Sequence, residues 1–557
     1  MSPKLSINDL RNASMKLLLV MVLLTGIATW RVIDAAIPGA PEVSMVERTA
    51  IDKGAELERS KLWGDAIEHY KHSLETWPDN NDLSYGLRRS KFHFSIDRRY
   101  TDDSFTGQML SLNTNEAFQL LNDVYNKIQV YYVEPVQLSY FVAHGTESLY
   151  LALNNERFVA MHMPKADPRS VMELRKVLRE NYWNKSLSSF SQAQQMILEI
   201  SRRANTLTGI QPVPVIMEYL FGGCNALDDY SRYLTPGKLT DLYSNINGEF
   251  VGLGIEMKAE TDKGVLLVNV LPDSPAEAGG LEPGDYILSI DGHNCLPLST
   301  EQAANYLTGL AGSRVNIEWK QATTGQVLKK QFTRREVKIR SIPLTFMVNQ
   351  ADGIGYIKMT GFQKTTGTEL DAALTNLNNQ GMKSVILDLR GNPGGLLSAA
   401  VDVLDRFIEQ GVLVSTKGRM SDQDSTYTAH QLGTWNVDLI LLVDENSASA
   451  SEVVAGAIRD HNRGLLIGNR TYGKWSVQSI YDVSMGTGIK LSTAKYFSPH
   501  GHWFGGVGLR PDFPVEAKED TYKRVTAKTL NEDPVFQKAV DLLQNHRTTM
   551  KSMRRIN

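Results

Sequence analysis

The stretch "LILLVDENSASASEVVAGAIRDHNRGLLIG", residues 439–468, decides the fold of the second half of the chain. It opens with five apolar residues in a row, which is typical of a strand buried on both faces. Apolar residues then recur at helical spacing: Val453, Val454, Ala457 and Ile458. A second apolar run, "LLI", closes the stretch. The order strand, helix, strand predicts a layered α/β core whose helix begins at residues 449–451.

The flanking sequence extends this pattern. Apolar runs at 353–359 and 384–390 alternate with helical stretches at 368–381 and 398–410. Upstream, residues 247–337 contain short β-rich runs separated by Gly, Pro and Asp, which predicts a small β domain. Residues 114–246 are mostly helical in pattern. We therefore expect a multidomain α+β protein with a helical N-terminal region.

The overall composition is that of an ordinary globular protein. Of the 557 residues, 42% are hydrophobic and 22% are charged, and the net charge of -3 gives no reason to expect nucleic acid as a partner. Cys224 and Cys295 stand far apart and form neither a disulfide framework nor a zinc-binding pattern, so we expect two packed thiols. No metal or cofactor is predicted.

The N-terminus carries a targeting pattern. Basic residues precede "LLLVMVLLTGIATW", residues 17–30, an apolar run with the length of a signal-peptide core and shorter than the ~20 residues that span a bilayer. This predicts export to the cell envelope or periplasm. The leader is either cleaved or kept as a membrane anchor; the alternative is a buried helix of a cytoplasmic protein.

An amphipathic helical pair is predicted at residues 54–80. Its Ala, Trp, Tyr and Pro positions resemble a single tetratricopeptide repeat. One repeat cannot bury its own face, so we expect the pair to pack on neighbouring helices. Docking of a protein partner is the second interpretation.

Three serines, Ser447, Ser449 and Ser451, lie at the start of the helix predicted after residue 448. Unpaired N–H groups and the positive end of the helix dipole favour negative charge there. A serine oxygen held at this point could attack a carbonyl, and the neighbouring amides could bind the resulting oxyanion. A serine at a helix start is also an ordinary N-cap.

Two further segments suggest how such a serine would be activated. "DLRGNPGG", residues 388–395, ends a buried strand in glycines, whose N–H groups could form an oxyanion hole. "RTYGKWSVQ", residues 470–478, offers Lys474 and, four residues on, Gln478. A lysine serves as a base only when neutral, so burial must lower its pKa from ~10.4 by roughly 3 units. An amide can orient that amine without adding charge.

Together these segments resemble the carboxyl-terminal processing peptidases, the tail-specific serine proteases with a Ser-Lys dyad. The resemblance implies that Ser449 is the nucleophile, Lys474 the general base and Gln478 the residue that orients it. It also implies an oxyanion hole formed by the N–H groups of Ala450 and Gly395, with Gly394 as the alternative. The core that this family shares is of the crotonase and ClpP type.

The resemblance also accounts for the predicted β domain. "GLGI", residues 252–255, followed by "SPAEAGGLEPGDYILSIDG", resembles a PDZ domain. The resemblance implies that the loop of Gly252, Leu253, Gly254 and Ile255 binds the terminal carboxylate of a polypeptide substrate. "LDDYSRYLTP", residues 227–236, resembles the family's "LDPHSxYL" segment. The PDZ domain is therefore expected to be inserted into the protease region.

The domain organisation follows from these assignments. We expect a leader at 1–37, a linker with the helical pair at 38–113, helices at 114–246, a PDZ domain at 247–337, the protease core at 338–516 and a C-terminal helix with a basic tail at 517–557. The predicted function is that of an exported serine endopeptidase.

Two other functions compete with this one. A catalytically silent peptide-binding scaffold would have lost at least one of Ser449, Lys474 and Gln478. A crotonase-like acyl-thioester enzyme would need no PDZ domain. His500 and His502 suggest a Ser-His mechanism, but Lys474 already fills the role of base. Where the family usually has the second glycine of "GKG", this chain has Trp475. We expect its indole either to exclude water from the Lys474 amine or to narrow the substrate path.

Overall fold

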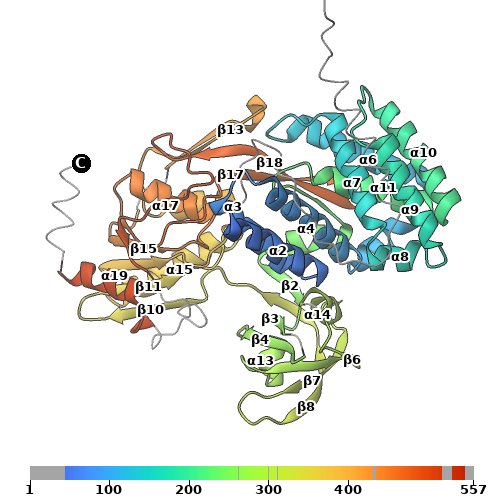
Figure 1. Ribbon diagram of the computed structural model, residues 1–557. Coiled ribbons are helices and arrows are strands. Elements are labelled where there is room, and N and C mark those ends of the chain that lie inside the picture. Colours follow the sequence, from blue (N-terminus) through green and yellow to red (C-terminus); the bar gives the residue numbers. More distant parts are fainter. Residues whose placement is uncertain are drawn as a thin grey trace, which may run out of the picture. The chain divides into compact units, whose positions relative to one another are not determined.

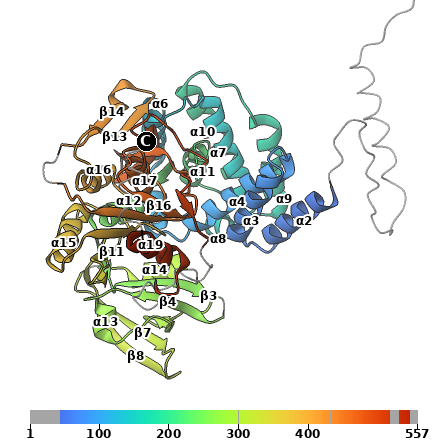
Figure 2. The ribbon, with the colours of Figure 1, turned by 90° about the vertical axis from the view of Figure 1, so that its left-hand side faces the viewer.

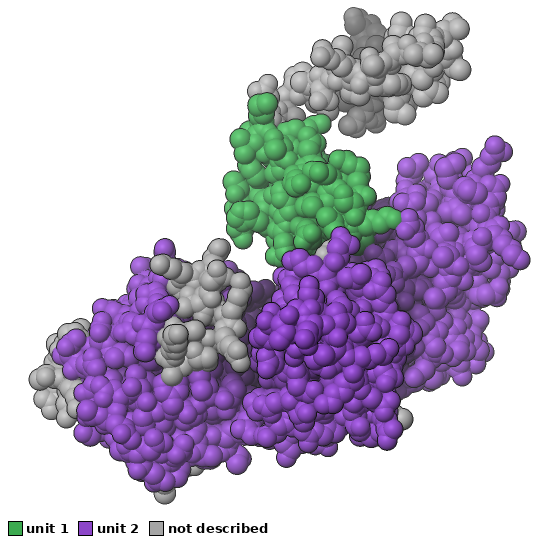
Figure 3. Space-filling view, turned by 90° about the horizontal axis from the view of Figure 1, so that it is seen from below, with its two compact units in different colours: residues 1–87 green, residues 88–557 purple. Residues whose placement is uncertain are grey.

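The computed structural model describes residues 44–260, 262–298, 300–309, 311–430, 434–516 and 530–545 (Figure 1). The predicted leader at 1–37 and the basic tail lie outside the described residues. The chain divides into two compact units, residues 1–87 and 88–557 (Figure 3).

The first unit contains a helical pair, α2 (Met45–Arg59) and α3 (Trp63–Thr76), and the start of α4 (Asn81–Arg99). Tyr70 is its central core residue, with 2% of its surface exposed. Gly54 and Gly86 make room for this ring, because a Cβ at either glycine would lie 2.3 or 2.4 Å from it. In the part of the chain that the structure describes, no helix is long and apolar enough to cross a membrane.

The second unit begins with a helical region. Its helices are α5 (Asp103–Gly107), α6 (Thr114–Tyr131), α7 (Leu138–Ala152), α8 (Glu156–His162), α9 (Pro168–Val177), α10 (Phe190–Thr208), α11 (Pro212–Cys224) and α12 (Pro236–Asn247). Helices α7 and α11 approach closely at Gly145, where a Cβ would lie 2.8 Å from the Tyr219 Cα. Cys224 on α11 is buried and free, as is Cys295, so the prediction of two packed thiols is confirmed.

The predicted β domain forms a sheet in the order β3-β4-β5-β7-β8, with β6 paired to β5. Its elements are β3 (Ile255–Glu260), β4 (Gly264–Val270), α13 (Pro275–Gly279), β5 (Tyr286–Ile290), β6 (His293–Asn294), α14 (Thr300–Leu307), β7 (Arg314–Lys320) and β8 (Val327–Thr333). A separate pair, β2 (Glu249–Gly252) and β9 (Arg335–Lys338), joins the two ends of the domain.

The α/β core is built on a sheet in the order β10-β11-β12-β15-β16-β19. Its strands are β10 (Leu344–Asn349), β11 (Ile354–Lys358), β12 (Ser384–Asp388), β15 (Asp438–Val443), β16 (Leu465–Gly468) and β19 (Phe513–Pro514). All neighbouring pairs are parallel except β10 with β11. This confirms the buried strands predicted from the apolar runs.

Helices cover both faces of this sheet (Figures 1 and 2). The helices are α15 (Thr366–Asn379), α16 (Leu397–Asp405), α17 (Ala450–Asp460) and α19 (Pro534–Asn545). Neighbouring strand residues alternate between the two cores: Leu387 and Leu441 pack with α15 to α17, whereas Ile386 and Ile440 pack with α19. This alternation explains why the strands are apolar on both faces.

A second, antiparallel sheet has the order β1-β18-β13-β14, with β17 paired to β18. Its strands are β1 (Arg232–Leu234), β13 (Val412–Gly418), β14 (Ser425–Thr428), β17 (Ser476–Val483) and β18 (Thr487–Phe497). Strand β1 comes before the β domain in the chain, yet it pairs with β18 of the α/β part. In the chain, the β domain therefore lies between β1 and the strand with which β1 pairs, and the multidomain α+β fold class is confirmed.

Candidate active site

Ser449 lies in a strained turn between β15 and α17. Its φ is 55° and its ψ is -114°, a conformation that costs a residue with a side chain about 1–3 kcal/mol. It is the N-cap of α17, so its side chain projects where the unpaired N–H groups of the helix gather. Strained strand-to-helix turns of this kind expose the nucleophile of many serine hydrolases.

The two neighbouring serines are fully buried and hold this turn in place. The Ser447 hydroxyl accepts from the Asp444 N–H at 3.0 Å and lies 2.9 Å from the Leu389 carbonyl oxygen. The Ser451 hydroxyl donates to the Asn392 carbonyl oxygen at 2.9 Å. Ser449 differs from these two serines, because its hydroxyl faces the phenol of Tyr496. Burial raises the pKa of that phenol, and its hydrogen bond with Ser449 opposes the rise.

The glycine loop of "NPGG" packs directly against Ser449. A Cβ at Gly394 would lie 2.8 Å from the Ser449 Cβ and 2.9 Å from the Ala450 nitrogen. The Gly394 N–H is occupied, however, because it donates to Oδ1 of Asn392 at 2.9 Å. Among the described residues, the N–H groups of Gly395 and Ala450 donate to no acceptor. The loop therefore leaves Gly395 and Ala450, the pair named from the sequence, as available donors.

Glu452 connects the serine turn to the lysine loop. Its Oε2 accepts from the N–H groups of Ser449 (3.0 Å) and Lys474 (2.7 Å). Its Oε1 accepts from the Gly473 N–H (2.7 Å) and the Thr471 hydroxyl (2.6 Å). Burial raises the pKa of this carboxyl, and the four hydrogen bonds oppose the rise. One carboxylate thus fixes the backbone of both predicted catalytic residues.

Lys474 is half-buried, and its amine lies over an aromatic ring. The Nζ atom is 4.8 Å from the centre of the Tyr230 ring. Burial lowers the pKa of Lys474, and the charge of Arg232 lowers it further, whereas Asp228 and Glu452 oppose these effects. The surroundings of Lys474 therefore favour the neutral amine more than water does.

The predicted catalytic side chains are not joined to one another in this arrangement. Within the described part of the chain, no hydrogen bond links the Lys474 amine to Ser449 or to Gln478. The Gln478 amide instead donates to the carbonyl oxygen of Ser476 at 2.8 Å and to its hydroxyl at 2.7 Å. The backbone brings the three residues to one place, while the side chains of Lys474 and Gln478 face other partners.

A second lysine lies near this site. Lys490 on β18 is paired in register with Arg232 on β1. Burial lowers the pKa of Lys490 to about 8, and the charges of Arg232 and Lys474 contribute to the fall while Asp228 opposes it. Lys474 therefore shares its surroundings with two further cationic side chains.

The loop predicted to bind peptide connects β2 to β3. Gly252 ends β2, Leu253 is 2% exposed, Gly254 has a φ of 79° and Ile255 begins β3. Among the described residues, the N–H groups of Leu253 and Gly254 donate to no acceptor. The loop thus presents two free donors beside β3, which is an edge strand of its sheet.

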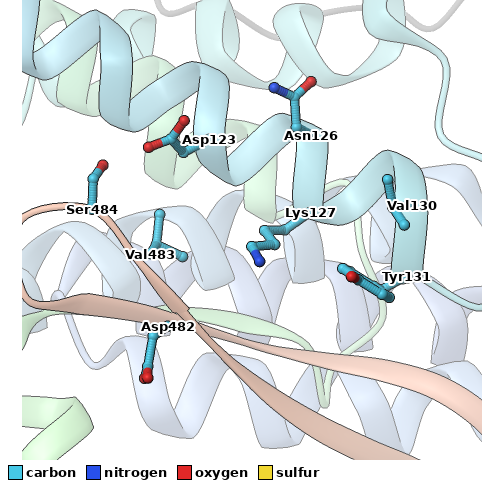
Figure 4. A pocket seen from close by; sticks show the side chains of 8 residues that line it. All are labelled: Asp123, Asn126, Lys127, Val130, Tyr131, Asp482, Val483 and Ser484. Carbon is cyan, nitrogen blue, oxygen red and sulfur yellow. The ribbon is translucent and has the colours of Figure 1, made fainter.

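A hollow of about 330 Å³ lies between α6 and the end of β17 (Figure 4). The Lys127 amine occupies its centre, 5.6 Å from the ring centres of Tyr131 and Tyr481. None of the predicted site residues lines this hollow. Among the described residues, no cluster of His, Cys, Asp and Glu could hold a metal ion.

The structure also places three residues whose role was open. Trp475 is 2% exposed and packs in the core beneath α17, with its ring centre 5.0 Å from that of Phe504. It is a core residue. The His500 Nδ1 lies 3.8 Å from Asp460, and in the described residues neither His500 nor His502 bonds to Ser449.

Glu452, Arg232 and Lys490 were missed from the sequence. Glu452 had a recognisable signal, because Ser449 and Glu452 have the spacing of a capping box at a helix start. Arg232 and Lys490 had no such signal in the sequence. Their proximity to Lys474 comes from the pairing of β1 with β18, two strands that lie far apart in the sequence.

Comparison with known proteins identifies the class. Residues 353–515 match peptidase family S41, and residues 267–321 match the PDZ domain. The fold and these matches define a serine peptidase that carries a PDZ domain. The chain is 34% identical over 317 residues to the carboxyl-terminal-processing protease of Picosynechococcus sp., covering 57% of this chain and 76% of that protein. It is also 34% identical over 298 residues to the carboxy-terminal-processing protease of Bartonella bacilliformis, covering 52% of this chain and 67% of that protein.

The chain therefore belongs to the carboxyl-terminal-processing protease family, and it is an enzyme. Among solved structures, it is similar to the photosystem II D1 C-terminal processing protease, with 25% identity and a TM-score of 0.38, over 72% of this chain and 93% of that one.

Proposed function

We propose that this protein is an exported endopeptidase that recognises the C-termini of polypeptides through its PDZ domain and cleaves them by a Ser-Lys mechanism. The observation that carries the mechanism is the shared hydrogen bonding of Ser449 and Lys474 to Oε2 of Glu452. The backbone nitrogens of Ser449 and Lys474 both lie within hydrogen-bond distance of Oε2, so the two backbones are close together. The Lys474 side chain can therefore reach Ser449 by rotation about its own bonds.

The proposed reaction begins with the neutral amine of Lys474. This amine removes the proton of Ser449 as the oxygen attacks the scissile carbonyl carbon. The N–H groups of Gly395 and Ala450 stabilise the oxyanion. When the tetrahedral intermediate collapses, the C–N bond breaks and the Lys474 ammonium returns its proton to the leaving amine. Water then hydrolyses the acyl-enzyme with Lys474 again as the base.

Gln478 has an orienting role in this proposal. It carries no charge, so it can hold the amine without favouring the ammonium form. Its amide must turn away from Ser476 to do so, since it donates there in the present arrangement. Lys474 likewise leaves Tyr230 when it reaches Ser449. The proposed active arrangement therefore differs from the present one in the orientation of two side chains, those of Lys474 and Gln478.

The PDZ loop would bind the terminal carboxylate of the substrate. The free N–H groups of Leu253 and Gly254 are donors suited to a carboxylate, and β3 offers a strand edge to an extended peptide. This gives the enzyme a preference for chains that end in a free carboxylate.

The central experiment incubates the purified full chain with an unfolded protein, with and without Ser449→Ala. Cleavage by the parent and none by S449A supports the proposal. Cleavage by both would contradict the nucleophile assignment. A second arm compares one peptide with a free and an amidated C-terminus, where a lower KM for the free form is expected and equal KM values would contradict carboxylate recognition.

Export is tested separately. A reporter fused after residue 50 should cross the membrane when the apolar run at 17–30 is intact. Accumulation of that reporter in the cytoplasm would contradict export.

A further inference from the structure

Two cationic side chains, Arg232 and Lys490, lie close to Lys474, the proposed general base. Arg232 on β1 stands opposite Lys490 on β18 in the antiparallel register. Tyr230, two residues before Arg232, lies with its ring under the Lys474 amine, 4.8 Å away. The Ser231 hydroxyl accepts from the Ser492 N–H at 2.9 Å, which fixes this segment against β18.

The positive charges in this cluster exceed the negative ones. Within the described residues, the side chains of Arg232, Lys474 and Lys490 form no ion pair and no hydrogen bond with another protein group. Asp228 is the carboxylate whose charge reaches both lysines. Glu452 also faces Lys474, but it is already bound by four donors.

We propose that Arg232 is a positioning residue that acts through Lys474: its permanent positive charge, held opposite Lys490 across β1 and β18, keeps the Lys474 amine neutral and therefore available as the base. This inference rests on the proposed Ser-Lys mechanism. It assigns a role to a residue outside the predicted catalytic set.

The physical reason is that Arg232 cannot give up its charge, whereas Lys490 can. Burial and Arg232 both lower the pKa of Lys474, and the pKa of Lys490 falls to about 8. As the pH rises through that value Lys490 loses its charge, and the guanidinium remains as the cation of the cluster. Burial raises the pKa of the Tyr230 phenol, so this group brings no negative charge that would oppose Arg232.

The test is the pH profile of kcat on one peptide for the parent, Arg232→Gln and Arg232→Lys. Loss of the positive charge should move the rising limb of the profile to higher pH by about half a unit to one unit. Below the inflection, R232Q should then be about three- to tenfold slower than the parent, since one pKa unit corresponds to a factor of ten. Above the inflection the two rates should be equal. R232K should follow the parent while its amine is charged and should move toward R232Q at higher pH, because a lysine in this cluster can lose its charge as Lys490 does.

Asp228→Asn should move the pH profile in the opposite direction, because Asp228 raises the pKa of Lys474 whereas Arg232 lowers it. Its Oδ1 accepts from the N–H groups of Ser231 (2.8 Å) and Tyr230 (3.3 Å), and the oxygen of an asparagine can do the same. The variant loses only the negative charge, so its profile should move to lower pH. Lys329→Gln on β8, an exposed side chain, is the charge control and should leave the inflection in place.

Ionic strength gives an independent check. Arg232 is exposed, so added salt should screen its charge and bring the parent profile toward that of R232Q. The R232Q profile should move less.

The outcomes separate this inference from the proposed function. If the parent profile has its lysine inflection but R232Q only lowers the plateau, the role of Arg232 is structural and the inference is overturned while the Ser-Lys mechanism stands. If S449A or Lys474→Ala cleaves as fast as the parent, the proposed function itself fails. Equal profiles for R232Q and D228N would also overturn the inference.

Discussion

The backbone N–H groups of Ser449 and Lys474 donate to the same oxygen, Oε2 of Glu452, at 3.0 and 2.7 Å. Ser449 belongs to the start of α17 and Lys474 to the loop before β17, so the carboxylate joins two elements that the chain builds separately. The positions of nucleophile and base are thus set by the backbone. Their side chains contact other partners, Ser449 the phenol of Tyr496 and Lys474 the ring of Tyr230.

Glu452→Gln should damage both stability and catalysis. The amide keeps the size of the carboxyl, but it replaces one acceptor oxygen with an NH₂ group, which two of the four donors would then face. Leaving buried donors unpaired costs about 1–3 kcal/mol each. Urea unfolding should show that loss, and kcat should fall because the serine turn and the lysine loop lose their common anchor.

The matched control is Glu445→Gln in the same turn. Glu445 is exposed, and its carboxylate accepts from the Asn469 amide at 3.2 Å. This variant should keep the parent's stability and rate. Parent-like behaviour of E452Q would contradict the anchoring role.

The three serines should separate by function. Ser449→Ala should abolish cleavage. It should also lower the free energy of unfolding by about 0.5–1.5 kcal/mol, because it removes the hydrogen bond with the Tyr496 phenol. Ser447→Ala and Ser451→Ala should remain active but less stable by about 1–3 kcal/mol, since their hydroxyls bond buried carbonyl oxygens. Peptide cleavage and urea unfolding measure both effects. Equal loss of activity in all three variants would mean that the cluster only caps the helix.

The sequence predicted the elements of the core well, because alternation and apolar runs reflect local burial. The strand of residues 439–443, the helix after Ser449 and the turn between them follow directly from it. The direction of side chains could not be predicted in this way. Gln478 bonds to Ser476 and Lys474 lies over Tyr230, and these contacts depend on the pairing of β17 and β1 with β18. Trp475 shows the same limit, since nothing local in the sequence indicates that it packs under α17.

The glycine loop should depend on the C-terminal helix. Arg390 donates to Asp388 and, through Nη1, to Asp533 at 2.6 Å, just before α19. All three side chains are buried. Asp533→Ala removes the buried carboxylate that accepts from Nη1, while the pair with Asp388 stays, so the free energy of unfolding should fall by about 1–3 kcal/mol. The activity should fall with it, since Arg390 precedes the loop that carries Gly395.

Asp541→Asn is the control on the same helix. Its side chain is exposed, so urea unfolding and peptide cleavage should match the parent. A D533A variant as stable and as active as the parent would show that α19 does not support the loop.

The network at Asp388 also predicts acid sensitivity. Burial alone would raise the pKa of this carboxyl, but the charges of Arg390 and Lys358 overcome it and hold the pKa below its usual range. Its contribution to stability is therefore present above the unfolded pKa of about 3.9 and is lost as the pH falls below it. Urea unfolding at a series of pH values should show stability decreasing below about pH 4. Stability unchanged to lower pH would contradict this assignment.

Gln478→Glu tests the base itself. In the parent, activity should rise with pH through the lowered pKa of Lys474, because only the neutral amine removes the proton of Ser449. A glutamate at 478 keeps the size of the side chain but cannot donate to Ser476 as the amide does. Its carboxylate would stabilise the Lys474 ammonium and move the rising limb to higher pH by about one unit, or about tenfold in rate at neutral pH. Ser476→Ala is the control. It removes the hydroxyl partner of Gln478, keeps the backbone carbonyl partner and adds no charge, so it should leave the inflection where it is. A base at His500 or His502 would instead give an inflection near ~6.5 that Q478E does not move. An unchanged Q478E profile with full activity at neutral pH would therefore end the Ser-Lys assignment.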